Sequence, residues 1–238
     1  MQRDGLIRSI GGKNIPPKLL REAAACGFTI DSNQITLNLL DPTQYTHEMR
    51  LACHDLGIKL LLSSPLAGGL LTNRYFQTRA EPPPWEMTPT ERNYLVKVVS
   101  PWARKHSHGG RWRVFQDVMM DTLGDVALKH GVSVASVALR WAMQLDHVAS
   151  VVVACRLGEL SDGSPFDRPR QLRQVFQFEL DEEDMERLWD ASGEELRKTP
   201  DFNPFDFENM TFEDMEEGYE DTLFLPNASK QKLWLNSY

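Results

Sequence analysis

The first 65 residues alternate between short apolar runs and segments with helical spacing, and this pattern limits the possible folds more than any other feature. Three apolar runs predict strands, namely Leu6–Ile10, Phe28–Leu37 and Ile58–Ser63. Between them, Pro16 and Pro17 open a predicted helix that ends at Gly27, and a second predicted helix covers about residues 46–56. Strands joined to helices by short connections predict an α/β fold with a parallel sheet. Because Ile58–Ser63 is almost entirely apolar, we expect it to be covered on both faces.

Residues 65–111 interrupt this alternation. They contain the pair Gly68 and Gly69, three successive prolines from Pro82 to Pro84, and a polar stretch before residue 111. We predict a long loop here. A loop of this length inside a compact domain is usually functional or mobile.

Regular structure is predicted again from Trp112 onward. Apolar residues keep helical spacing after Trp112, Gly131 ends that helix, and Ser133 caps the next one. Ser150–Ala154 is a fourth predicted strand, and Asp181 caps a final helix. Four strands that each begin a βα unit amount to half of an eight-stranded barrel.

We divide the chain into two parts. Residues 1–193 form the predicted half-barrel, and residues 194–238 form an acidic C-terminal extension that we expect to be only partly ordered. The net charge is −8, and residues 206–221 hold eight acidic and no basic residues, so the remainder of the chain is neutral. A neutral domain argues against nucleic acid as a partner. No apolar run approaches the ~20 residues of a membrane helix, so we expect no membrane association.

Cys26, Cys53 and Cys155 show no CxxC spacing, so we expect free thiols in a reducing compartment. The N-terminal residues have no signal-peptide core, and we therefore expect a cytoplasmic protein. His106 and His108 flank a serine with no Cys or further His nearby, so we predict no metal site.

Several local strings resemble the aldo-keto reductase family. They are IRSIGGKN at residues 7–14, DSNQI at 31–35, GIKLLLSSPLAGGLLTNRY at 57–75, HGVSVASVALRW at 130–141 and VVVACR at 151–156. They are similar to the family's fifth, sixth and seventh strands, the helix before the eighth strand, and that strand itself. The resemblance covers about residues 5–190 and implies the second half of a (β/α)8 TIM barrel, with about four βα units. It also implies an NADP-dependent oxidoreductase that reduces a small carbonyl substrate by hydride transfer.

The resemblance assigns the nicotinamide cofactor to the carboxyl ends of the strands, where (β/α)8 barrels hold their active sites. Asn14 and Gln34 would hydrogen-bond the nicotinamide carboxamide, because an amide offers both a donor and an acceptor. The alternative is that both amides only satisfy backbone groups at the strand ends. Lys13 and Ser63 stand where the family usually has a serine and a stacking aromatic residue. We therefore expect a weakened hold on the cofactor.

Ser64, Leu66 and Gly68 match the family's loop over the cofactor pyrophosphate, where a glycine-rich backbone permits close approach to phosphate. Arg156 stands where the family places groups that face the adenosine phosphate of NADPH, and the implied role is a bidentate contact. An ordinary glycine turn and a solvated loop arginine are the alternatives.

No catalytic residue is predicted in this sequence. By resemblance, the catalytic Asp, Tyr, Lys and His belong to the first four strands, and this sequence begins near the fifth. Two functions therefore stay open. One is an oxidoreductase that lacks its catalytic half. The other is a non-catalytic half-barrel that binds a cofactor or a protein and self-associates through its open sheet edges, for instance as a homodimer that rebuilds an eight-stranded barrel.

Overall fold

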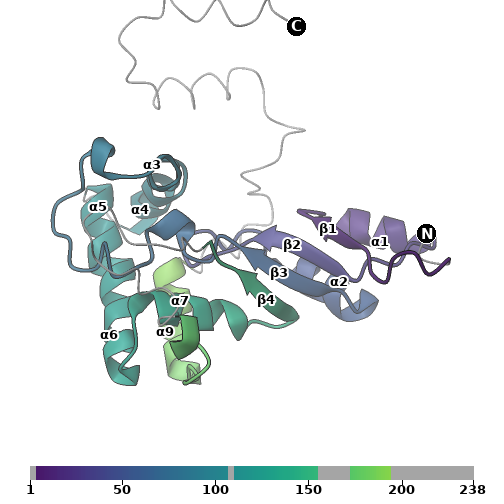
Figure 1. The fold of residues 1–238 in the computed structure, drawn as a ribbon. Coiled ribbons are helices and arrows are strands. Elements are labelled where there is room, and N and C mark those ends of the chain that lie inside the picture. Colours follow the sequence, from purple (N-terminus) through teal and green to yellow (C-terminus); the bar gives the residue numbers. More distant parts are fainter. Residues whose placement is uncertain (1–3, 107–109, 155–171, 194–238) are drawn as a thin grey trace, which may run out of the picture. The chain divides into compact units, whose positions relative to one another are not determined.

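The computed structural model describes residues 4–106, 110–154 and 172–193, which form an α/β fold around one parallel sheet (Figure 1). The sheet has four strands in the order β1-β2-β3-β4. The strands are β1 (Gly11–Lys13), β2 (Ser32–Thr36), β3 (Lys59–Ser63) and β4 (Val148–Val152). Every neighbouring pair is parallel, which confirms the predicted fold class.

Helices connect the strands and follow the last one. They are α1 (Pro17–Ala25), α2 (His47–Leu56), α3 (Pro89–Tyr94), the π-helical segment η3 (Leu95–Val99), α4 (Ser100–His106), α5 (Arg111–Val114), the π-helical segment η4 (Phe115–Met120), α6 (Asp121–His130), α7 (Val134–Met143) and α9 (Glu182–Ser192). Two short 3-10 turns, η1 (Ala67–Gly69) and η2 (Pro84–Glu86), precede α3. None of the described helices has the length and apolar character needed to cross a bilayer.

The helix boundaries follow the capping residues predicted from the sequence. Helix α1 begins at Pro17, because proline fits the first helical turn. The Ser133 hydroxyl accepts a backbone N–H at the start of α7. Asp181 and Asp184 form a capping box at the start of α9. Gly131 ends α6 in the left-handed conformation, with a φ of 65°.

Two strands differ from the apolar runs that predict them: β1 lies after its predicted run, and β2 is shorter than its run. The ladder begins at the pair Gly11 and Ser32, so the predicted strand over Leu6–Ile10 is wrong, and the Leu6 side chain is 71% exposed. Strand β2 likewise begins four residues after Phe28, whose side chain is 64% exposed. A strand exists only where it finds a pairing partner, and the local pattern does not reveal that partner.

The predicted long loop over residues 65–111 is wrong, because residues 89–106 form consecutive helical segments. Thr88 opens this run with a capping box. Its hydroxyl accepts from the backbone N–H of Glu91 at 3.2 Å, and Glu91 Oε2 accepts from the backbone N–H of Thr88 at 2.6 Å. Pro89 occupies the first helical position. The string Thr-Pro-Thr-Glu at residues 88–91 is therefore a helix-start signal that lies inside the predicted loop.

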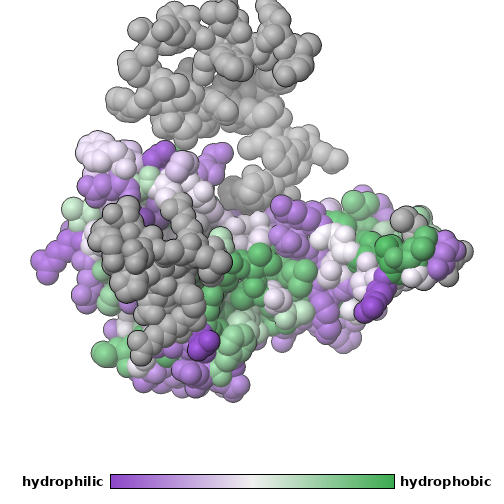
Figure 2. Space-filling model, viewed as in Figure 1, coloured by the Kyte–Doolittle hydropathy of each residue, from purple (hydrophilic) through white to green (hydrophobic). Residues whose placement is uncertain are grey.

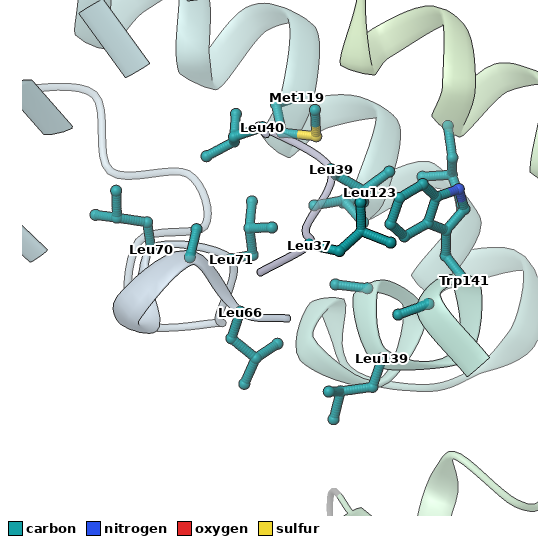
Figure 3. Packing of buried hydrophobic residues seen from close by; sticks show 14 of the residues in the cluster. Leu37, Leu39, Leu40, Leu66, Leu70, Leu71, Met119, Leu123, Leu139 and Trp141 are labelled. Carbon is teal, nitrogen blue, oxygen red and sulfur yellow. The ribbon is translucent and has the colours of Figure 1, made fainter. Parts of the chain in front are cut away.

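One hydrophobic cluster joins the strands to the helices that follow them. Leu37 and Leu39, which follow β2, lie among side chains that include Leu123 of α6 and Trp141 of α7 (Figure 3). Leu66 enters the same cluster from the loop after β3. Each fully buried side chain of this kind stabilises the fold by ~1.5–3 kcal/mol. The loops at the carboxyl ends of β2 and β3 are therefore anchored in the core.

One face of the sheet is covered by helices. Asn33 of β2 contacts Met49 of α2 through its side chain, and Leu60 and Leu62, which share that face, are fully buried. On the opposite face, which we call the open face, lie the exposed or half-buried side chains of Lys13, Ser32, Gln34, Thr36, Lys59, Leu61, Ser63 and Val152. Figure 2 shows hydrophobic surface over β4. Within the described residues, Ile58–Ser63 is thus covered on one face, not on both as predicted.

Candidate functional site

The carboxyl ends of the parallel strands meet at one edge of the sheet, which we treat as the candidate site. Three non-glycine residues just beyond these ends have positive φ angles: Asn14 at 52°, Ser64 at 57° and Ala67 at 48°. This conformation is unfavourable for a residue with a Cβ, so surrounding contacts must hold the backbone in place. Held backbone of this kind is often found at ligand sites.

Asn14 and Gln34 lie side by side at this edge. The backbone N–H of Asn14 donates to the Gln34 carbonyl at 2.7 Å, and Gln34 pairs in register with Lys13. Asn14 is exposed, whereas Gln34 is half-buried on the open face. Gln34 is the third residue of β2, but it is level with the end of β1, since Lys13 is the last residue of β1. The structure therefore places the backbones of these two predicted residues next to each other.

Ser63 is the last residue of β3, and its hydroxyl bonds within the sheet. It donates to the carbonyl of Ile35 at 3.1 Å and lies 3.4 Å from the Thr36 hydroxyl. These contacts tie the carboxyl ends of β2 and β3 together. The position supplies a small polar group rather than the flat ring on which a nicotinamide would stack.

Ser64 is held by two neighbouring elements. Its carbonyl accepts from the side-chain amide of Asn38 at 3.3 Å, and its side chain forms a hydrogen bond with Tyr94 of α3. Asn38 is fully buried, and its Oδ1 also accepts the backbone N–H groups of Leu40 at 3.0 Å and Asp41 at 3.1 Å. Asn38 thereby fixes the loop after β2 against the loop after β3.

Leu66 and Gly68 belong to the loop after β3. The Leu66 side chain is buried in the core, so only its backbone can reach a ligand. Gly68 has a φ of 70°, and a Cβ at this position would lie 2.9 Å from Thr90 Cγ2 and 3.0 Å from Tyr94 Cδ2. Glycine is required here by the packing of α3 as well as by the backbone angle. Helix α3 therefore covers one side of the predicted phosphate loop.

Replacing Gly68 with alanine is expected to lower the free energy of unfolding by about 2 kcal/mol, half from the positive φ and half from displaced side chains. Gly131→Ala is the matched control, because Gly131 has a φ of 65° but no atom lies within 4 Å of a Cβ there. The control should lose only about 1 kcal/mol. Urea unfolding followed by circular dichroism measures both losses, and equal values would contradict the packing argument.

Each tyrosine in the described part of the chain has a raised pKa. Burial raises the pKa of Tyr45 and Tyr75 above the ordinary value of a phenol. Burial also raises the pKa of Tyr94, although its hydrogen bond with Ser64 opposes the change. A general acid works best with a pKa near the operating pH, and burial moves the pKa of all three phenols away from that range.

The remaining predicted contact, Arg156, lies outside the described residues.

Cys26 and Cys53 are free thiols, the first exposed and the second buried, and burial raises the pKa of Cys53 to about 11. Within the described ranges, no group of three His, Cys, Asp or Glu side chains is placed to hold a metal ion.

Sequence reasoning missed the residues that position the candidate site. Asn38 belongs to the string Asn-Leu-Leu-Asp-Pro, which is a turn signal. Glu91 is 4% exposed and bonds with Arg74 at 3.2 Å, and a Cβ on Gly69 would lie 3.1 Å from its Oε1. No local sequence pattern indicated that Tyr94 would lie near the carboxyl end of β3. Its position depends on where α3 packs.

The family model described as "Aldo/keto reductase family" matches residues 1–192. Because this match covers most of the chain, the protein belongs to the aldo-keto reductase family. This confirms the resemblance of the local strings.

Three known proteins to which this chain is similar are longer than it is. A chloroplastic pyridoxal reductase from Arabidopsis thaliana is 25% identical over 147 residues, which are 60% of this chain and 35% of the plant protein. The glycerol dehydrogenase AKR11B4 from Gluconobacter oxydans is similar with a TM-score of 0.55 and 20% identity, over 85% of this chain and 54% of that one. The thermostable aldo-keto reductase Tm1743, solved with the inhibitor epalrestat, gives a TM-score of 0.51 and 21% identity over 80% and 50%.

The chain thus spans about half the length of these solved structures. At this level of identity the likeness establishes the fold. The predicted partial (β/α)8 barrel is therefore confirmed, with four parallel strands in the described residues.

Proposed function

We propose that this chain is the cofactor-side half of an NADP-dependent carbonyl reductase and that it needs further residues to reduce an aldehyde or ketone. The observation that carries the proposal is the placement of Asn14 beside Gln34 at the edge where β3 ends at Ser63 and Ser64 follows. Two adjacent amides can pair with a carboxamide, since each offers a donor and an acceptor. Membership of the family supports a nicotinamide cofactor.

Each part of the site has a role in this proposal. Asn14 and Gln34 bind the carboxamide, the backbone around Ser64, Leu66 and Gly68 approaches the pyrophosphate, and Arg156 pairs with the adenosine phosphate. Bound cofactor supplies the hydride. The exposed Lys13 stands beside Gln34 and adds a positive charge at the same edge.

The same proposal makes the chain inactive by itself. The described tyrosines have raised pKa values, and an unassisted carbonyl accepts hydride slowly.

A non-catalytic binding or interaction module is the second candidate, and the open face favours it. Self-association through the sheet edges is one form of that candidate. The free thiols of Cys26 and Cys53 support a reducing compartment such as the cytoplasm.

Titration of the purified chain with NADPH, followed by cofactor fluorescence, tests the proposal. We expect saturable binding with a Kd on the order of 1 mM, or about −4 kcal/mol. Gln34→Leu should weaken binding about tenfold, because it removes hydrogen bonds worth roughly 1.4 kcal/mol. Ser32→Ala is the matched control, since Ser32 lies on the same face at the amino end of β2.

Ser32→Ala should bind NADPH as the unchanged chain does. A lack of saturation, or equal weakening by both substitutions, would refute cofactor binding at this edge and leave the interaction module.

A further inference from the structure

The loop after β3 has a backbone conformation that its neighbours must hold in place. Ala67, Gly68 and Gly69 have successive φ angles of 48°, 70° and 119°. The backbone N–H groups of Gly69 and Leu71 both donate to the Leu66 carbonyl, at 2.9 Å and 3.2 Å. Hydrogen bonds within a loop open easily unless packed neighbours prevent it. The shape of this loop therefore depends on the residues that lie against it.

Glu91 of α3 is a buried carboxylate that lies against this loop. It is 4% exposed, and a Cβ on Gly69 would lie 3.1 Å from its Oε1. Nη1 of Arg74, which follows the loop, donates to the same Oε1 at 3.2 Å. The backbone N–H of Thr88 donates to Oε2 at 2.6 Å. The Glu91 carboxylate therefore joins the end of the loop to the first turn of α3.

The contacts of Arg74 fix the orientation of this carboxylate. The Arg74 guanidinium also donates to the Glu86 carbonyl and lies 5.1 Å from the centroid of the Tyr75 ring. A buried carboxylate needs a partner of this kind, because an ionised group loses its hydration on burial. Since both oxygens of Glu91 accept hydrogen bonds, its side chain cannot turn without breaking one of them. The Gly69 backbone thus packs against a group that is held on two sides.

We propose that Glu91 is a positioning residue that holds the loop after β3 in the conformation needed to approach a phosphate group. Glu91 touches no cofactor in this role and acts through Gly69 and Arg74. Its effect on cofactor binding rests on the function proposed above, whereas its hold on the loop can be measured without any cofactor.

Amide hydrogen exchange of the full chain without cofactor tests the hold on the loop. Glu91→Gln keeps the size of the side chain but turns an amide NH2 toward one of the two donors. We therefore expect the amides of Gly69 and Leu71 to exchange about tenfold faster than in the unchanged chain. Asp184→Asn is the matched control, since Asp184 is also a buried carboxylate in a capping box with a basic partner. It should leave exchange in the loop within about twofold of the unchanged chain.

Titration of the same variants with NADPH tests the effect on cofactor binding. Glu91→Gln should raise the Kd about tenfold, and Asp184→Asn should leave it unchanged. Equal exchange in the two variants, or NADPH binding by Glu91→Gln that is unchanged or tighter, would overturn the proposal. If the unchanged chain binds no NADPH, the function proposed above fails, and the exchange result alone decides whether Glu91 holds the loop.

A milder substitution covers the case in which Glu91→Gln does not fold. Thr88→Val removes the hydroxyl that caps α3 but keeps the backbone N–H that donates to Glu91. Because it loosens the first turn of α3, it should speed exchange in the loop about threefold. Thr46→Val is its control, since the Thr46 hydroxyl caps α2 by accepting the N–H of Met49 at 3.1 Å. Equal acceleration by both variants would contradict a hold on the loop by α3.

Discussion

Replacing Trp141 with alanine is expected to lower the free energy of unfolding by about 3–5 kcal/mol, because it leaves a large cavity in the core. Trp141 of α7 is fully buried, and its ring meets the ring of Trp189 of α9 edge to face, with centroids 4.8 Å apart. An aromatic pair of this geometry adds to the effect of burial alone. Urea unfolding followed by far-ultraviolet circular dichroism measures the loss without relying on tryptophan emission.

Two further substitutions separate the effect of burying the Trp141 ring from the effect of its indole N–H. Trp85→Ala is the matched control, since Trp85 is 83% exposed, and it should cost less than about 0.5 kcal/mol. Trp141→Phe should cost only about 1–2 kcal/mol, because the buried indole N–H of Trp141 has no hydrogen-bond partner among the described residues. Equal losses for the two alanine variants would contradict the packing seen in Figure 3.

Replacing Asp184 with alanine is expected to lower the free energy of unfolding by about 3 kcal/mol, because this buried carboxylate holds α9 against α6. Asp184 is 1% exposed, accepts from Lys129 Nζ at 2.9 Å and lies 2.7 Å from His130 Nε2. It also completes the capping box with Asp181. The Lys129 side chain is 42% exposed, so water replaces part of its contact, and the expected loss stays at the lower end for a buried pair.

Asp125→Ala is the matched control for the same pair of helices. Asp125 of α6 bonds with Arg187 of α9 at 2.8 Å, but its side chain is 67% exposed. An exposed ion pair contributes ~0.5 kcal/mol or less, so this variant should melt almost as the unchanged chain does. Denaturation of both variants at one pH gives the comparison. If Asp184→Ala lost no more than Asp125→Ala, burial of the carboxylate would not be what joins α9 to α6.

The sequence predicted helix boundaries better than strand boundaries. Pro17, Ser133 and Asp181 each satisfy or tolerate the free N–H groups of their own first helical turn, so these starts are visible within a few residues. Strand β1 was misplaced because its limits depend on a partner, Ser32, that lies twenty-one residues after Gly11. An apolar run such as Leu6–Ile10 does not become a strand without one.

The candidate site likewise contains residues that local sequence predicts and contacts that it does not. The local strings predicted Asn14, Gln34 and Gly68 as site residues, since their types and neighbours are properties of short segments. They did not indicate that Asn38 would reach across to Ser64, because that contact joins two loops that only the packed sheet brings together.

By itself, the sequence determined that strands and helices would alternate around a parallel sheet and that a glycine loop would follow β3. Only the tertiary structure decided that α3 would lie on Gly68 and that Lys13 and Lys59 would share a sheet face on which their side chains are exposed among the described residues. The physical reason is the distance along the sequence between the residues that interact. Caps and turns are settled by hydrogen bonds between near neighbours, whereas the cover of a sheet face depends on which distant segments bury their apolar surface against it.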